Sequence, residues 1–434
     1  MRDLNIVILG GGSYNWAPKL MADLALTKSL SGRLTLMDID PEPLSLMVGV
    51  GRRMMAELGG NFRVEGTGSQ AEALQSADYV ILTINTGGYE ATRQDLEIPE
   101  RYGAVQTVGD TVGPGGLMRG LRNIPVVAAL ARDMERICPQ AWLLNYSNPM
   151  AILTRAVSMV SDIRVAGLCH ELLGLEYKLA SMLGLPEIGR VKLKVGGINH
   201  FSWVSEATLD GEDILPRVRE FARNWKVDVP YEDFSPYGDQ MLVKFRLLET
   251  TGLLGVAGDR HIVEFYGHFI SPQSEHGWLY GVKRTTAGDF EEEYAQNGLR
   301  AKGMLAGEEP LPAHPSGEIV FQIIEAMERD ESREFFVNLP NVGQIANLPL
   351  DCIVETQAIA NGKGLTPLAF GELPPAVLSQ VRLHSDIQDM VVEAALTGDR
   401  ELALQAFLLD PLINDFAAGR QMFEEMCRAQ GLFV

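Results

Sequence analysis

Cysteine is scarce in this sequence, which has only 4 in 434 residues. Cys138, Cys169, Cys352 and Cys427 lie far apart and form no Cys-x-x-Cys pair. This spacing argues against a disulfide framework and against a structural zinc site, because both need cysteines at close or regular intervals. We therefore expect four free thiols.

Long apolar runs and basic clusters are also missing. No run reaches the roughly 18 apolar residues that a membrane span needs, and Met1 to Asp3 lead straight into a strand pattern instead of a signal peptide. The 57 acidic residues outnumber the 37 Lys and Arg residues, and the net charge of −20 disfavours nucleic acid and anionic membrane surfaces. We expect a cytoplasmic protein that binds neither.

The first half of the sequence alternates short apolar runs with helical patterns. Residues 4–9 form an apolar run that stops at three glycines, and Pro18 marks the first turn of a helix. A second strand over residues 33–37 ends at Asp38, and Pro41 starts the next helix. Further strands are expected at residues 62–64, 79–84, 142–145 and 164–168. This alternation predicts an α/β fold with a Rossmann-like, doubly wound parallel sheet.

The pattern changes near residue 191. Longer strands are expected at residues 191–195 and 201–208, and helices follow, such as one over residues 377–396. A single hydrophobic core rarely grows beyond about 250 to 300 residues, so two domains are expected. We place the Rossmann-like domain at residues 1–196 and a C-terminal α+β domain, with substrate, metal and subunit contacts, at residues 197–434.

The glycine turn has the features of a dinucleotide site. Gly10, Gly12 and Ser13 lie between a strand and a helix, where backbone amides and the helix dipole favour a pyrophosphate. Asp38 ends the second strand, where its carboxylate can bind ribose hydroxyls and would repel a 2′-phosphate. The sequence therefore favours NAD over NADP. A plain structural turn is the alternative, because Asn15 replaces the third glycine of Gly-x-Gly-x-x-Gly.

Four polar segments follow or interrupt predicted strands. In a doubly wound sheet the carboxyl ends of the strands form the ligand crevice, so these segments are expected to converge there. Cys169 and His200 within them suit an open metal position, although a buried cysteine and a core histidine are common without any metal. The segments span residues 108–116, 145–150, 169–172 and 196–201.

Taken together, these motifs resemble glycoside hydrolase family four, whose members use NAD and usually manganese. The resemblance covers nearly the whole chain and implies the fold that this family shares with the lactate dehydrogenase superfamily. The motifs that carry it are Gly10-Gly11-Gly12-Ser13, Asn148-Pro149, Cys169-His170-Glu171, Asn199-His200, Ala257-Gly258-Asp259-Arg260-His261 and Asn347-Leu348-Pro349.

Within that family, Cys169-His170-Glu171-Leu172 is similar to the Cys-His-Glu-Val form of the α-galacturonidases, and Leu172 departs from it conservatively. Residues 107–110, 119–122 and 258–261 also resemble this subgroup. The resemblance implies hydrolysis of short α-galacturonides by NAD-dependent oxidation at C3, deprotonation at C2, elimination, addition of water and re-reduction, with no net redox change.

The resemblance also implies catalytic and metal-binding roles. Cys169 and His200 are the expected ligands of Mn²⁺, with the cysteine as a thiolate. Asp259 is expected to remove the C2 proton. The alternative is a purely structural role, in which Asp259 only stabilises a turn. His170 is expected to act as general acid toward the leaving oxygen or to hold sugar hydroxyls. No role can be assigned to Glu171.

Substrate contacts are expected from the same segments. Asn148 and Asp110 are candidates for sugar hydroxyls, and Asn148 also for the metal. A chain of negative charge that binds a uronate needs a local fork of donors, and guanidinium groups match carboxylates in two-point contacts. Arg119 and Arg260 are the first candidates, with Arg122 in reserve.

Other functions remain open. One is an α-glucosidase or another family-four specificity. Another is an NAD-dependent 2-hydroxyacid dehydrogenase, because residues 145–149 resemble that superfamily as well, and net NADH production would reveal it. A non-enzymatic NAD sensor would bind cofactor without turnover. We expect a homodimer or homotetramer acting on a small sugar.

Overall fold

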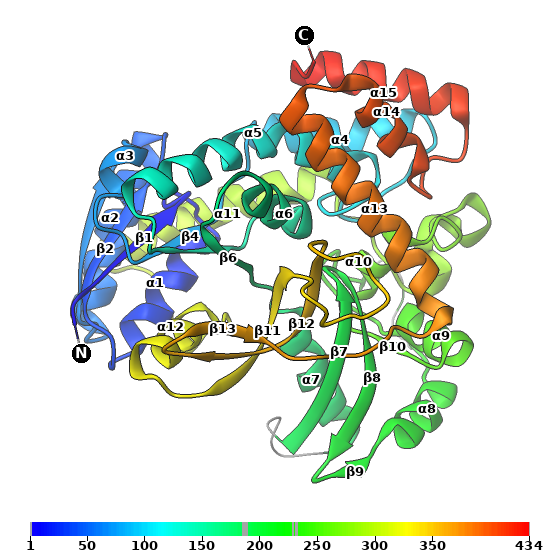
Figure 1. Ribbon diagram of the computed structural model, residues 1–434, viewed down its shortest axis with the longest axis horizontal. Helices are drawn as coiled ribbons and strands as arrows, with labels where there is room; N and C mark the ends of the chain where they lie inside the picture. Colours follow the sequence, from blue (N-terminus) through cyan, green and yellow to red (C-terminus); the bar gives the residue numbers. More distant parts are fainter. Residues whose placement is uncertain (1, 185–189, 228–229, 231–232, 434) are drawn as a thin grey trace.

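The computed structural model describes residues 2–184, 190–227, 230 and 233–433. Six parallel strands form its N-terminal half in the order β3-β2-β1-β4-β5-β6 (Figure 1). This confirms the Rossmann-like, doubly wound prediction. The strands are β1 (Leu4–Leu9), β2 (Gly32–Met37), β3 (Phe62–Thr67), β4 (Tyr79–Leu82), β5 (Trp142–Asn145) and β6 (Arg164–Gly167).

Helices cover both faces of this sheet. Along β1, Ile6 and Ile8 belong to one apolar core, and Val7 and Leu9 belong to another, because successive side chains of a strand point to opposite faces. The helices of this half are α1 (Trp16–Leu26), α2 (Pro41–Glu57), α3 (Gln70–Ala73), α4 (Gly88–Arg101), α5 (Gly113–Ile137) and α6 (Met150–Val160).

Antiparallel strands extend the same sheet beyond β6. Asn338 pairs with Gly167 of β6, and the order continues as β11-β12-β7-β8-β10. The added strands are β7 (Val191–Ile198), β8 (Phe201–Leu209), β9 (Glu212–Asp213), β10 (Leu254–Gly255), β11 (Arg333–Pro340), β12 (Ile353–Asn361) and β13 (Gly364–Pro367). The domain division between Gly196 and Gly197 stays a prediction, and the structure adds that β7 runs through this point.

Later helices return to pack on the N-terminal half. Val391, Phe407 and Phe423 share one apolar core with Leu121 and Ile152. The two halves of the chain therefore share cores. The helices of the second half are α7 (Glu171–Met182), α8 (Leu215–Asn224), α9 (Leu242–Thr251), α10 (Asp259–Ile262), α11 (Ala287–Ala306), α12 (Val320–Arg329), α13 (Pro375–Thr397), α14 (Arg400–Leu409) and α15 (Phe416–Gln430), with 3-10 turns η3 (Val263–Phe265) and η4 (Pro272–Tyr280).

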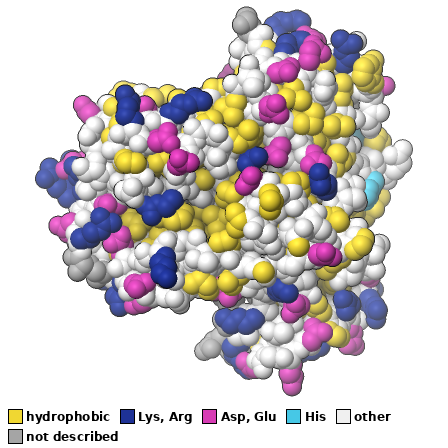
Figure 2. Space-filling model, in the orientation of Figure 1, with side chains coloured by type: hydrophobic (Ala, Val, Ile, Leu, Met, Phe, Trp, Pro, Cys, Tyr) yellow, Lys and Arg dark blue, Asp and Glu magenta, His cyan; other side chains and the backbone are white. Residues whose placement is uncertain are grey.

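The surface charges and the cysteines of the structure can be compared with what the composition predicts. On the face drawn in Figure 2, Lys and Arg side chains lie interspersed among Asp and Glu side chains. The four cysteines, all within the described ranges, are free thiols, as predicted. Among the described residues, none of the helices combines the length and the apolar character that crossing a bilayer requires.

Candidate functional site

A pocket of about 740 Å³ opens where β1, β2 and β4 end. The four residues predicted to bind a dinucleotide, Gly10, Gly12, Ser13 and Asp38, all line it. The apolar side chain of Ile39, 89% exposed, lies in the same wall. An apolar pocket with a few fixed polar groups is the usual form of a site for a cofactor.

Local contacts explain the shape of the glycine turn. Gly10 has a φ of +85°, and a Cβ there would lie 2.4 Å from the carbonyl oxygen of Thr83, so only glycine fits. The amide of Gly12 donates to Asp38 Oδ2 at 2.9 Å, and Ser13 Oγ accepts from the amide of Trp16 at 3.1 Å. The turn and the end of β2 thus hold each other in place, with the Asp38 carboxylate fixed at the pocket.

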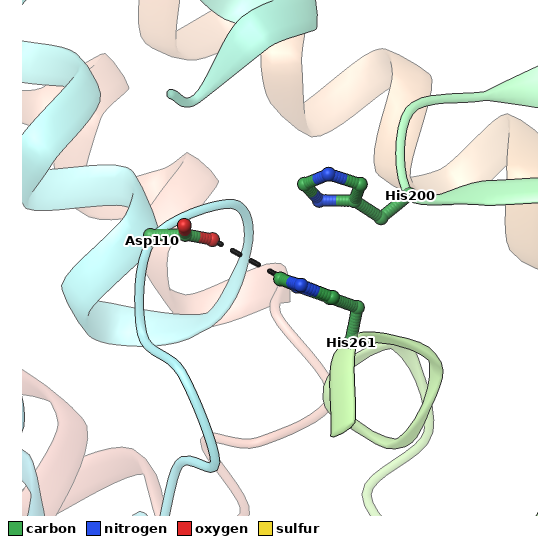
Figure 3. Close-up of side chains that lie close together, drawn as sticks. All are labelled: Asp110, His200 and His261. Atoms are coloured by element: carbon green, nitrogen blue, oxygen red, sulfur yellow. Dashed lines mark ion pairs between the residues drawn. The ribbon is translucent and has the colours of Figure 1, made fainter. Parts of the chain in front are cut away.

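A second polar centre contains Asp110, His200 and His261 (Figure 3). Asp110 precedes α5, His200 lies in the turn between β7 and β8, and His261 belongs to α10. One ligand atom from each residue lies within 4.8 Å of the other two. Asp110 Oδ1 is 4.0 Å from His261 Nδ1, and the two imidazole rings are 4.1 Å apart between centroids.

The turn that carries His200 is fixed from two sides. His200 Nδ1 pairs with Thr111 Oγ1 at 2.9 Å, which leaves Nε2 available as the second ring nitrogen. Buried Glu355 of β12 accepts from Asn199 Nδ2 at 3.3 Å and from Ser202 Oγ at 2.6 Å. Strand β12 therefore positions the β7–β8 turn, a contact that local sequence does not reveal.

One buried carboxylate shapes the loop that carries Asp110. Glu264 Oε1 accepts from the backbone amides of Thr107, Val108 and Gly109 at 2.7, 2.7 and 2.9 Å. Glu264 is fully buried, and burial raises its pKa to about 7. The loop is therefore held by a residue from η3, about 150 residues further along the chain.

Asn148 connects the two centres. Its Nδ2 donates to Asp110 Oδ2 at 2.9 Å, and its carbonyl oxygen accepts from Arg119 Nε at 3.1 Å. The preceding residue, Ser147, accepts through Oγ from the amide of Ile84, a pocket residue, at 2.7 Å. The pocket at the glycine turn and the polar centre are therefore neighbours. Asp110, Asn148 and Arg119, which the sequence predicts as substrate contacts, lie together, and their role stays a prediction.

Cys169 and His170, which are adjacent in the sequence, have different surroundings. Burial raises the pKa of the Cys169 thiol well above its usual range, and the nearby carboxylates of Glu355 and Glu171 raise it further. His170 Nδ1 lies 3.1 Å from Glu318 Oε1, and this contact raises the pKa of His170. The Cys169 sulfur is not one of the convergent ligand atoms found among the described residues.

Glu171, which had no predicted role, ties two motifs together. Its Oε2 accepts from the amide of Gly258 at 2.7 Å, and its Oε1 lies 3.9 Å from His261 Nε2. The start of α7 is thus joined to the turn that carries His261. This contact explains why the Cys-His-Glu and Gly-Asp-Arg-His segments belong to one site.

Asp259 lies in a buried charge network. Its two oxygens accept from the amides of Val243 and Lys244 at 3.0 and 3.1 Å, at the start of α9. Burial and the carboxylate of Asp239 raise the pKa of Asp259 to about 7. In the described geometry Asp259 supports α9, whereas His261, two residues further on, reaches the polar centre.

The candidate arginines have different surroundings. Arg260 Nη1 donates to the carbonyl oxygen of Pro236 at 3.0 Å, and the guanidinium lies 5.2 Å from the centroid of the Tyr237 ring. Its buried Nε has no hydrogen-bond partner among the described residues. Arg122, the reserve candidate, forms a buried two-point pair with Asp95 at 2.9 and 2.6 Å. Arg122 is therefore a structural residue.

The side chains of the polar centre suit the divalent metal that the sequence suggests. One carboxylate and two imidazoles converge, and the buried Oδ1 of Asn148 has no hydrogen-bond partner among the described residues. Burial and neighbouring His200 lower the pKa of His261 to about 3, so its ring is neutral and can ligate. Such oxygen and nitrogen donors suit a divalent metal such as manganese.

Asp110 and His261 are the convergent residues that the sequence prediction does not include in the metal set. The prediction places Asp110 among the substrate contacts, and from the segment that holds His261 it selects Asp259 and Arg260. Successive helical residues are rotated by about 100°, so a motif identifies the turn without showing which side chain faces the cleft.

Comparisons with known proteins agree with the motifs. Residues 5–185 match the family described as family 4 glycosyl hydrolase, and residues 195–413 match the C-terminal domain of the same family. The resemblance stated from the sequence is therefore confirmed.

Individual relatives match over nearly their full length. An alpha-galacturonidase of Bacillus subtilis is 35% identical over 436 residues, which cover 98% of this chain and 96% of the relative. A crystal structure of a B. subtilis protein described as a glucosidase has 34% identity and a TM-score of 0.92, covering 98% of this chain and 100% of that one.

A more distant structure supports the fold alone. It is the 6-phospho-beta glucosidase of Thermotoga maritima, solved with manganese, NAD⁺ and glucose-6-phosphate. It has 23% identity and a TM-score of 0.82 and covers 99% of both chains.

Proposed function

Because the chain belongs to family 4 of the glycosyl hydrolases, we propose that it is a glycosidase that cleaves short α-galacturonides with NAD and manganese. The observation that carries this proposal is the contact between the dinucleotide pocket and the Asp110, His200 and His261 centre, through Ile84, Ser147 and Asn148. A cofactor that oxidises the sugar and groups that move its protons must act on the same ring, so their sites must adjoin.

The cofactor is assigned to the pocket at the glycine turn. Gly10, Gly12 and Ser13, which line the pocket, would hold the pyrophosphate through backbone amides, and Asp38 would accept from the ribose hydroxyls. When bound, NAD supplies a reversible hydride acceptor for C3 of the sugar, which makes the C2 proton acidic. Asp38 disfavours a 2′-phosphate because its own carboxylate is negative.

The metal is assigned to His200, with Cys169 from the family motif and Asp110 and His261 from the geometry. A divalent metal held there would supply Lewis acidity toward the carbonyl oxygen of the oxidised sugar. Thr111 fixes the ring of His200, and Glu171 and Glu264 fix the two loops that carry His261 and Asp110. Hydrogen bonds from neighbouring residues thus hold the metal-binding side chains in fixed positions.

Two residues of one turn are candidates for removal of the C2 proton. Asp259 is the base that the family motif suggests, and its raised pKa of about 7 suits proton transfer near neutral pH. His261 is the second candidate, because its neutral ring lies in the polar centre. A neutral imidazole has one lone pair, so His261 can serve as the base only if it does not bind the metal. We retain His170 as the acid toward the leaving oxygen, since Glu318 holds its Nδ1 and leaves Nε2 for the substrate.

The uronate carboxylate is assigned to Arg119 and Arg260. Arg260 has a buried donor without a partner among the described residues, and Arg119 lies beside Asn148. Each change to Ala is expected to reduce kcat/KM for a galacturonide about a hundredfold, which corresponds to about 3 kcal/mol, and to spare a neutral galactoside. Arg382→Ala is the matched control, because Arg382 pairs with Asp386 on the exposed side of α13.

A panel of nitrophenyl glycosides, assayed with NAD, Mn²⁺ and a thiol reductant, tests the proposal. The α-galacturonide should be the best substrate, and nitrophenol released should greatly exceed NADH formed. Preference for a 6-phosphoglucoside would overturn the substrate class. NADH formed in step with product would favour a 2-hydroxyacid dehydrogenase, and bound NAD without any turnover would favour an NAD sensor. A cytoplasmic location and a homodimer or homotetramer stay predictions.

A further inference from the structure

Helix α11 lies in the second half of the chain (Figure 1). Its residues nevertheless form one wall of the dinucleotide pocket. Phe290, Glu293, Tyr294 and Asn297 all line the pocket. Their spacing of three, four and seven residues from Phe290 places them on one face of the helix. The pocket therefore has a continuous wall that a Rossmann-like domain alone does not supply.

Tyr294 of this wall meets the glycine turn. Its ring centroid lies 5.0 Å from that of Tyr14, which directly follows Ser13, and 6.2 Å from that of Tyr89. Gly298 permits this approach, because a Cβ there would lie 3.0 Å from Tyr14 Cε2. Tyr294 still has 50% of its surface exposed, so it presents a large aromatic area that a ligand in the pocket can cover.

Helix α11 is anchored at both ends. A capping box between Thr286 and Asp289 starts it, and the Tyr89 hydroxyl donates to the carbonyl oxygen of Ala287 at 3.1 Å. Near its other end, Ala301 and Met304 are buried in the core that α1 and α2 share. The wall is therefore a fixed part of the pocket.

We propose that the α11 wall, with Tyr294 at its centre, retains the dinucleotide so that one cofactor molecule serves many turnovers. The inference rests on the proposed function, in which the hydride returns to the sugar and the cofactor never needs to be exchanged. A dehydrogenase with net redox change must release its cofactor in each cycle, whereas slow release here does not limit the rate. Contact with a half-exposed aromatic ring slows dissociation because the ring must be exposed to water again.

The test uses the purified full-length protein with NAD and NADH as probes. Calorimetry gives the Kd of NAD, and displacement of fluorescent NADH in a stopped-flow instrument gives the dissociation rate. Tyr294→Ala should raise both about tenfold, whereas Tyr294→Phe should stay within twofold of the wild type, because the ring and not the hydroxyl makes the contact. Tyr177→Ala is the matched control, since Tyr177 is 56% exposed on α7 and does not line the pocket.

Further outcomes separate this inference from the proposed function. After gel filtration without added NAD, the wild type should keep its cofactor, whereas the Tyr294→Ala protein should lose it. Wild-type values for Tyr294→Ala would overturn the inference while leaving the glycosidase proposal intact. A wild-type protein that binds no NAD would overturn both. If Tyr294→Ala fails to fold, Phe290→Ala tests the same helix face, and an unchanged dissociation rate there overturns the inference.

Discussion

Replacing Glu264 by alanine should loosen the loop that carries Asp110. Three backbone amides, those of Thr107, Val108 and Gly109, would lose their common acceptor. Each buried amide without an acceptor costs about 1 to 3 kcal/mol. Part of this cost is offset, because the variant no longer buries a carboxylate whose pKa is raised to about 7 from 4.5, which at pH 8 is equivalent to about 3 kcal/mol.

The net destabilisation expected at pH 8 is about 3 kcal/mol. For a chain of this length that corresponds to a fall in Tm of about 3 °C. Scanning calorimetry with and without Mn²⁺ measures it, and electron paramagnetic resonance of free Mn²⁺ measures the metal affinity directly. Glu264→Ala should also bind Mn²⁺ at least tenfold more weakly, because Asp110 loses its fixed position.

Glu264→Gln is the conservative control. Its carbonyl oxygen can still accept from the three amides, and it carries no buried charge. At pH 8 the Tm should therefore rise by up to about 3 °C, because the three acceptor contacts stay and the cost of the buried charge, about 3 kcal/mol, is removed. The Mn²⁺ affinity should stay close to the wild type. Wild-type Tm and Mn²⁺ affinity in Glu264→Ala would refute the reasoning, because the carboxylate would then not be holding the loop.

Three more changes test other parts of the account. Cys169→Ser should lose Mn²⁺ affinity and turnover together, and wild-type turnover in this variant would exclude the thiol as a ligand. Asp38→Ala should weaken the preference for NAD, so the ratio of the Kd of NADP to the Kd of NAD, measured by calorimetry, should fall. An unchanged ratio would show that Asp38 does not select the cofactor. Burial lowers the pKa of His384 from 6.5 to about 4, so the stability present above pH 6.5 falls by about 3 kcal/mol as the pH drops to 4. In His384→Gln the free energy of unfolding, measured with urea, should fall less between pH 6.5 and pH 4. A fall equal to that of the wild type would show that His384 does not cause the pH dependence.

The parallel half of the fold was predictable because its signals are local. Apolar runs, the glycine turn and the helix-starting Pro41 lie within a few residues of the elements they define. The continuation of the sheet was not predictable. It depends on the pairing of Gly167 with Asn338, residues far apart in the sequence, and no short-range pattern encodes such a pairing. The same holds for α11, which reaches the cofactor pocket from the second half of the chain.

The candidate site was predictable at the level of segments. Gly12 and Asp38 line one pocket, as the strand–turn–helix pattern predicts, because their positions follow from the fold itself. Side-chain direction was harder to predict. His261 faces the polar centre, and Asp259 in the same turn supports α9. The sequence does not show that Arg122 already pairs with Asp95 of α4, which leaves no free guanidinium face for a substrate carboxylate.

The deuterium content of the product tests the central claim most directly. In deuterium oxide with NAD and Mn²⁺, a nitrophenyl α-galacturonide should yield galacturonate that carries deuterium at C2, with no net accumulation of NADH. Removal and return of the C2 proton explain both results, whereas direct displacement at C1 never breaks the C2–H bond. Asp259→Asn and His261→Gln then identify the base, since the residue that removes the proton is the one whose variant loses exchange while keeping its Mn²⁺ affinity. Product without deuterium at C2, formed at the same rate from C2-deuterated and from unlabelled substrate, would contradict the account.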